Sequence, residues 1–81
     1  LLSRGVRLAE PPRIIGVDRT HLILNVRHGE RVHKALAFGM AHRVAELQMG
    51  VPIDLVYTPR WNWFRGRVNM ELMVKDFSIG R

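Results

Sequence analysis

The chain repeatedly alternates apolar and polar residues, which is the period of a β-strand with one buried face. The alternation is clearest in residues 21–27, where Leu22, Leu24 and Val26 share one face. Other stretches alternate or are short and β-branched, and glycine, proline or other turn residues bound them. The sequence therefore predicts five strands, at residues 13–18, 21–27, 31–38, 53–58 and 67–77.

The third predicted strand, residues 31–38, has the least regular pattern. One face would carry Val32, Lys34, Leu36 and Phe38, while the other mixes basic residues with alanines. Neither face is cleanly apolar, so the pattern leaves the register of this strand open.

A short helix is predicted between the third and fourth strands. Met40, Val44 and Leu47 are spaced i, i+4 and i+7, which gives a two-turn helix one apolar face. Gly50 follows at a position suited to a left-handed cap, and Pro52 prevents the helix from continuing.

The predicted order of elements is β-β-β-α-β-β. It is typical of an all-β OB fold, a partly open barrel of five strands with one short helix between strands three and four. An SH3-like barrel is the alternative, and the helix in mid-chain argues against it. Gly5 and the pair Pro11–Pro12 predict a connector over residues 1–12, which leaves residues 13–81 as the OB domain.

The composition fits one small domain, because the chain has 81 residues of which 47% are hydrophobic. It has no cysteine, which fits a reducing compartment, and no apolar run near the roughly 18 residues of a membrane helix. We find no signal peptide and expect a cytoplasmic location without membrane contact. Because the first residue is not methionine, we expect the chain to be excised from a longer protein or processed.

Charge and aromatic residues point to nucleic acid. The net charge is +6, and residues 60–67 alone hold both tryptophans, one phenylalanine and three arginines. Bases stack on aromatic rings, and arginine forks match phosphate geometry, so this segment suits single-stranded nucleic acid. The alternative is a loop whose aromatic side chains pack on the core while its arginines face water.

The predicted fold places this segment beside a binding groove. An OB fold binds its ligand over strands two and three, flanked by the loop between strands four and five. We therefore predict a nucleic-acid site that comprises His21, Arg27, Arg31, Lys34, Arg60, Trp61, Trp63, Arg65 and Arg67.

Catalytic and metal chemistry is not predicted for this segment. None of the four histidines is spaced for metal ligation with a carboxylate or cysteine. No Ser-His-Asp set, glycine-rich phosphate loop or usefully spaced pair of carboxylates occurs. We expect no catalytic residue, no cofactor and no small-molecule ligand here.

Four segments carry a resemblance to a known family. They read AFGMAH at residues 37–42, DLVYTP at 54–59, NWFRG at 62–66 and LMVKD at 72–76. In this order and spacing they resemble the C-terminal OB domain of RecJ-type exonucleases, which act on single-stranded DNA. The similarity runs from about Ile14 to Phe77.

The resemblance implies a function and a parent protein. Such an enzyme removes nucleotides from single-stranded DNA in the 5′ to 3′ direction during DNA repair and recombination. It uses manganese or magnesium held by Asp-His-His-type motifs, which these residues lack. The segment would then grip single-stranded DNA while catalytic domains of the parent chain act. The alternative is an interdomain or protein–protein docking module.

The resemblance also sorts the aromatic residues. It implies apolar packing positions at Trp61 and Phe64, and usually a polar residue at the position of Trp63. We therefore expect Trp63 to be exposed and available for stacking. On the same grounds Phe38 is expected in the core, with a groove platform as the alternative.

Overall fold

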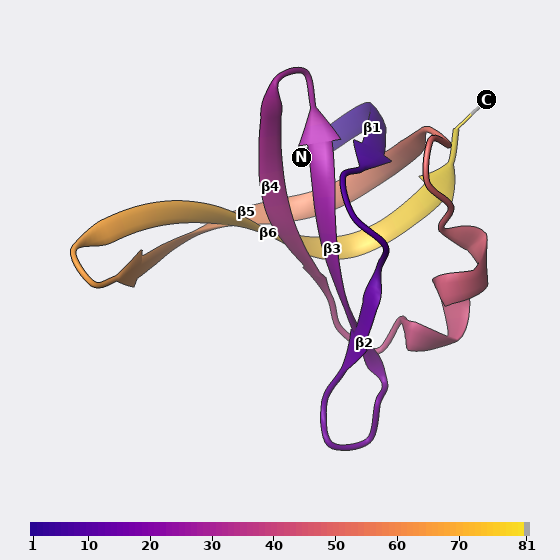
Figure 1. Cartoon of the computed structure of the whole chain (residues 1–81), viewed down its shortest axis with the longest axis horizontal. Helices are drawn as coiled ribbons and strands as arrows, with labels where there is room; N and C mark the ends of the chain where they lie inside the picture. The colour runs from indigo at the N-terminus through magenta and orange to yellow at the C-terminus, as the bar shows by residue number, and fades with distance from the viewer. Residues whose placement is uncertain (81) are drawn as a thin grey trace.

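The computed structural model describes residues 1–80, which form one curled sheet and a short helix (Figure 1). The helix, η1 (Ala41–Glu46), is a 3-10 helix between the fourth and fifth strands. The strands are β1 (Leu2–Leu8), β2 (Arg13–Ile15), β3 (His21–His28), β4 (Arg31–Ala37), β5 (Ile53–Phe64) and β6 (Arg67–Ile79).

The strand pairing closes on itself. The order in the sheet is β1-β5-β6-β4-β3-β2, and β1 also pairs with β3. A ring of β1, β5, β6, β4 and β3 results, in which only the β4–β6 pair is parallel. This is an OB-like β-barrel with its helix between β4 and β5, so the predicted all-β OB fold is confirmed.

Residues 1–12 were predicted as a connector, and for most of them that prediction is wrong. Strand β1 pairs with β5 and β3, and its Val6 and Leu8 are buried in the core. The register with β5 shifts between Ser3 and Val6, at Gly5 with φ +73°. This irregularity breaks the period of two, which is why the alternation was invisible in the sequence.

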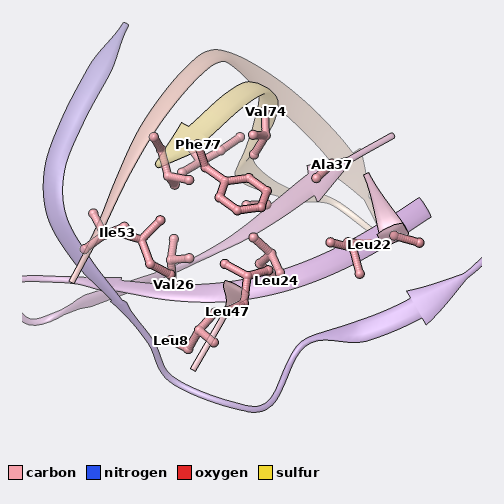
Figure 2. Close-up of a cluster of buried hydrophobic side chains, with 14 residues drawn as sticks. Leu8, Leu22, Leu24, Val26, Ala37, Leu47, Ile53, Val74 and Phe77 are labelled. Atoms are coloured by element: carbon pink, nitrogen blue, oxygen red, sulfur yellow. The ribbon is translucent and has the colours of Figure 1, made fainter. Parts of the chain in front are cut away.

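Alternate residues of the strands fill the barrel. Leu22, Leu24 and Val26 of β3 are completely buried, as their shared face predicted. Leu24 lies opposite Ala35 of β4, so the inward face of β4 carries small alanines. Figure 2 shows this cluster, whose buried members are Val6, Leu8, Leu22, Leu24, Val26, Ala35, Ala37, Ala41, Leu47, Ile53, Leu55, Leu72, Val74 and Phe77.

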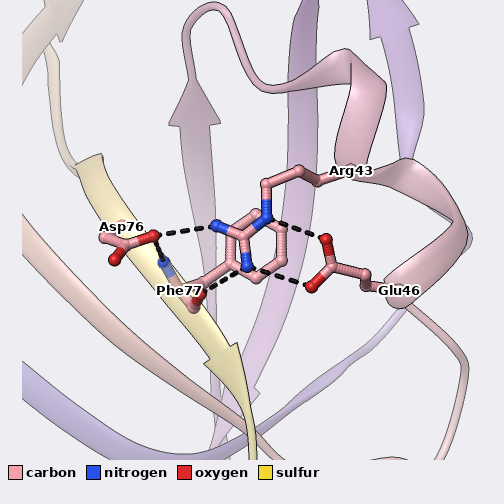
Figure 3. Close-up of polar contacts among 4 residues, drawn as sticks. All are labelled: Arg43, Glu46, Asp76 and Phe77. Carbon is pink, nitrogen blue, oxygen red and sulfur yellow. Dashed lines mark hydrogen bonds and ion pairs between the residues drawn. The ribbon is translucent and has the colours of Figure 1, made fainter.

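A short helix is present between β4 and β5 as predicted, but it is tighter than expected. The two-turn prediction over residues 40–47 becomes the 3-10 helix η1. Its predicted apolar face is confirmed, because Leu47 is buried and Met40 and Val44 pack against the core. The Arg43 side chain ties η1 to β6 through hydrogen bonds with Asp76 and the Phe77 carbonyl (Figure 3).

Strands β5 and β6 continue beyond the barrel as a two-stranded ribbon, the orange arm in Figure 1. The aromatic segment at residues 60–67 is therefore largely strand, whereas the sequence predicted a loop. Only Arg65 and Gly66 form the turn, with φ +51° and +76°. Two successive positive φ values match a type I′ turn, whose twist suits a hairpin.

Candidate nucleic-acid interface

The ribbon separates its side chains onto two faces. Residues directly opposite each other in an antiparallel pair project to the same side, and successive residues project to opposite sides. One face carries the pairs Trp61–Met70 and Trp63–Val68; the other carries Arg60–Glu71, Asn62–Asn69 and Phe64–Arg67. Rings and guanidinium groups that alternate in the sequence are thus largely on opposite sides.

The tryptophan face continues the inner face of the barrel. Leu72, the buried partner of Pro59, is the last core residue of β6 before the ribbon. Beyond it, Trp61 is 66% exposed and Trp63 is 73% exposed. Trp63 is exposed as expected, but the packing role expected for Trp61 is wrong, because its ring lies largely in solvent while its partner Met70 packs against the edge of the core.

Phe64 also departs from the packing expectation. It lies beside the turn on the face opposite the tryptophans and is 62% exposed. Its ring contacts a cation, since the guanidinium carbon of Arg65 lies 5.1 Å from the ring centroid. Phe64 is therefore a surface aromatic residue.

Two of the cations predicted to bind phosphate form ion pairs with one buried carboxylate. Glu71 is only 6% exposed, and its carboxylate lies 3.0 Å from Arg60 Nη2 and 3.6 Å from Lys34 Nζ. Both cations remain about half exposed. The sequence analysis missed Glu71, because the cross-strand pairing with Arg60 and the parallel pairing with Lys34 bring the three together.

The outer face of β3 and β4 holds other predicted residues. Arg27 pairs with Val32, and Asn25 pairs with Lys34, on the side away from the core. Both Arg27 on β3 and Lys34 on β4 are exposed. This face therefore offers cations, although Lys34 is shared with Glu71.

His21 has a fixed orientation at the far end of β3. Its Nδ1 accepts a hydrogen bond of 2.9 Å from the backbone N–H of Gly39. Its ring meets Phe38 edge to face, with centroids 5.1 Å apart. Phe38 is 51% exposed, so its expected place in the core is wrong and the alternative, an exposed platform, agrees with its position.

Arg31 lies apart from the outer-face residues. Along β4 it shares the inward side with Ala35 and Ala37, but it stands at the strand's start, where it is exposed. By strand face, the predicted residues other than the turn residue Arg65 divide into two groups, whose members do not all lie close together. The outer group is His21, Arg27, Lys34, Arg60 and Arg67, and the tryptophan group is Arg31, Trp61 and Trp63.

A hollow lies beside the loop between β2 and β3. It has a volume of about 340 Å³ and includes Arg19, Thr20 and His42, which the sequence analysis did not select. A hydrogen bond from Thr20 lowers the pKa of Asp18 in the same loop. No sequence motif marked these residues, because the fold alone brings the loop to η1.

Two absences bear on other kinds of site. Among residues 1–80, no three His, Asp or Glu side chains are grouped so as to hold a metal ion. Within the same residues, no helix is long and apolar enough to cross a membrane.

The barrel, the helix between β4 and β5, and the projecting β5–β6 ribbon define an OB-fold domain. The family model described as the RecJ OB domain matches residues 1–76, so the chain belongs to the RecJ OB domain family. The resemblance found in the sequence is thereby confirmed. No curated protein matches the sequence.

Proposed function

We propose that the chain is the single-stranded-DNA-binding domain of a RecJ-like 5′ to 3′ exonuclease. In this proposal it grips the strand while catalysis takes place in other domains of the parent protein, with manganese or magnesium held there. The domain itself contributes no catalytic residue and no metal ligand. Its partners are single-stranded DNA and those catalytic domains, in the cytoplasm.

One observation carries the proposal: two exposed tryptophans project on a basic ribbon of an OB domain. Trp61 and Trp63 present their rings to solvent, Arg65 stands in the turn that follows, and Arg67 begins β6 on the opposite face of the ribbon. Exposed indoles stack with bases of any sequence, while arginines meet the phosphates. The net charge of +6 favours a polyanion over the whole surface.

The test is a titration of the chain with mixed-sequence single-stranded oligonucleotides, followed by fluorescence polarisation. We expect weak binding with little sequence preference, because stacking and phosphate contacts do not read base edges. Affinity should fall steeply as salt rises from about 50 mM, through release of counterions. Absence of binding at high micromolar protein in about 50 mM salt would refute the proposal.

The second candidate function is docking against another domain or protein. The exposed aromatic residues of the ribbon favour it, because a large apolar patch is typical of a protein interface. Docking through apolar contacts would depend only weakly on salt. The salt dependence of ribbon contacts therefore separates the two functions.

A further inference from the structure

The parallel strands β4 and β6 separate at the base of the ribbon. Their pairing joins Lys34 with Glu71, Ala35 with Leu72 and Leu36 with Met73. The same register, continued toward the amino ends, would pair residues 31–33 with residues 68–70. In the described part of the chain the β4–β6 pairing stops at Lys34, so these two stretches are splayed apart.

The gap between the splayed strands is an open hollow of about 460 Å³. This volume falls in the range of small-molecule sites, which is roughly 300–1,000 Å³. The lining residues come from the two separated stretches and from the neighbouring position on β5. They are Arg31, Val32, His33, Trp61, Val68, Asn69 and Met70.

The lining combines apolar groups with the guanidinium of Arg31 and the imidazole of His33. Trp61 supplies an indole ring, and Val68 and Met70 add apolar surface on the same face of the ribbon. Arg31 and His33 stand across the hollow on β4. None of the seven lining residues carries a carboxylate. This lining is complementary to a ligand in which a flat apolar group is attached to an anion.

We propose that this hollow receives one nucleobase of the bound single strand. The base stacks on Trp61 and contacts Val68 and Met70, while Arg31 binds the adjoining phosphate. The inference rests on the proposed function and adds to it the side of the ribbon along which the strand runs. That side is the tryptophan face, which carries Trp61 and Trp63.

Electrostatics favours this side over the outer face. On the outer face, Arg60 and Lys34 share the Glu71 carboxylate, which offsets part of their attraction for phosphate. Arg31 faces a hollow with no acidic lining residue. A nucleic-acid strand fits this arrangement better than an apolar peptide does, because the rim is cationic.

The first test compares two aromatic residues on opposite faces of the ribbon. Trp61→Ala and Phe64→Ala each remove an exposed ring, 66% and 62% exposed respectively, so both variants should remain folded. We expect Trp61→Ala to weaken oligonucleotide binding roughly 5- to 150-fold, a typical stacking loss. Phe64→Ala should change it by less than about twofold, and Trp61→Phe should retain intermediate affinity.

The second test compares two arginines on opposite sides of the β3–β4 hairpin. Arg31→Ala should make the negative slope of log K against log salt shallower by about 0.7, as expected for one lost phosphate contact on a single strand. Arg27→Ala, on the outer face, should change the slope less.

Photocrosslinking of an oligonucleotide that contains 5-iodouracil should label Trp61 rather than Phe38 or Phe64.

The outcomes separate the two proposals. If the unaltered chain fails to bind any oligonucleotide, the proposed function fails and the base site fails with it. If binding occurs but is lost in Phe64→Ala and Arg27→Ala and kept in Trp61→Ala and Arg31→Ala, the strand uses the outer face. The base site is then overturned while the proposed function stands. Crosslinks confined to Phe38 would likewise overturn the base site and leave the proposed function standing.

Discussion

The guanidinium carbon of Arg43 lies 3.9 Å from the centroid of the Phe77 ring, so the cation sits against a core aromatic residue. The same guanidinium donates a 2.8 Å hydrogen bond to the Phe77 carbonyl. It also donates to Glu46 and Asp76 (Figure 3). One side chain thus fastens η1 to β6, and because it is only 25% exposed, solvent screens these contacts incompletely.

Removing this side chain should destabilise the domain. We expect Arg43→Ala to lower the free energy of unfolding by about 1–3 kcal/mol, since several charge-assisted hydrogen bonds and a cation–π contact are lost. Arg43→Lys should recover only part of this, because an ammonium cannot reproduce the planar fork. Urea denaturation measures the effect, with Arg4→Ala as control, because Arg4 is an exposed residue of β1. Equal losses in Arg43→Ala and Arg4→Ala would contradict the prediction.

The Arg43 contact also predicts a dependence of stability on pH. Hydrogen bonds from Arg43 lower the pKa of Glu46 below its ordinary 4.5. Because the folded pKa is the lower one, the unfolded chain binds more protons in this range. The stabilisation is therefore complete above about pH 4.5 and is lost as the pH falls through the folded pKa.

Melting temperatures measured between acidic and neutral pH test this sign. Glu46→Gln should be less stable than the unaltered chain at neutral pH, and the difference should shrink in acid. Glu30→Gln, in the exposed β3–β4 turn, serves as the control. A difference that grows as the pH falls would show that the sign is wrong.

Glu71 gives a prediction about the base of the ribbon. Glu71→Ala removes the carboxylate that lies between Arg60 and Lys34. Because both cations are about half exposed, water can solvate them, and we expect a loss of about 1–2 kcal/mol rather than the larger penalty of a buried pair. Denaturant unfolding of Glu71→Ala and of the exposed control Glu30→Ala would measure it. A silent Glu71→Ala would mean that packing alone holds the ribbon base.

The exposed and buried phenylalanines should differ sharply. Phe77→Ala empties a site in the core, where the ring is 2% exposed, and should lower stability by about 3–5 kcal/mol. Phe64→Ala and Trp63→Ala, at the exposed ribbon, should change it by less than about 0.5 kcal/mol. Circular dichroism melting compares the three variants. If Phe64→Ala melts as early as Phe77→Ala, the ribbon packs on the barrel in solution.

The class of fold and several of the strands and the helix could be predicted from local patterns in the sequence. Leu22, Leu24 and Val26 alternate in β3 and are all buried, because a strand with one face in the core needs a period of two. Met40, Val44 and Leu47, which span η1 and its two flanking positions, marked the apolar side that packs on the core. Both signals are local, so they can be recognised in a few consecutive residues.

Two strand features could not be predicted from the sequence pattern: strand β1 and the length of the β5–β6 ribbon. Strand β1 escaped detection because the irregularity at Gly5 interrupts its period. The ribbon was not predicted because its length depends on how far β5 and β6 stay paired. That pairing joins nearby residues of one hairpin, but both faces of the ribbon lie largely outside the core, so no buried face marks these residues as strand.

The candidate site shows the same division. The composition of residues 60–67 identified the aromatic residues and arginines as candidate ligands. The structure then placed Trp61 and Arg60 on opposite faces, joined Arg60 to Glu71, and set Arg31 across the hollow from Trp61. Strand register decides such relationships, because a shift of one residue exchanges the two faces of a strand.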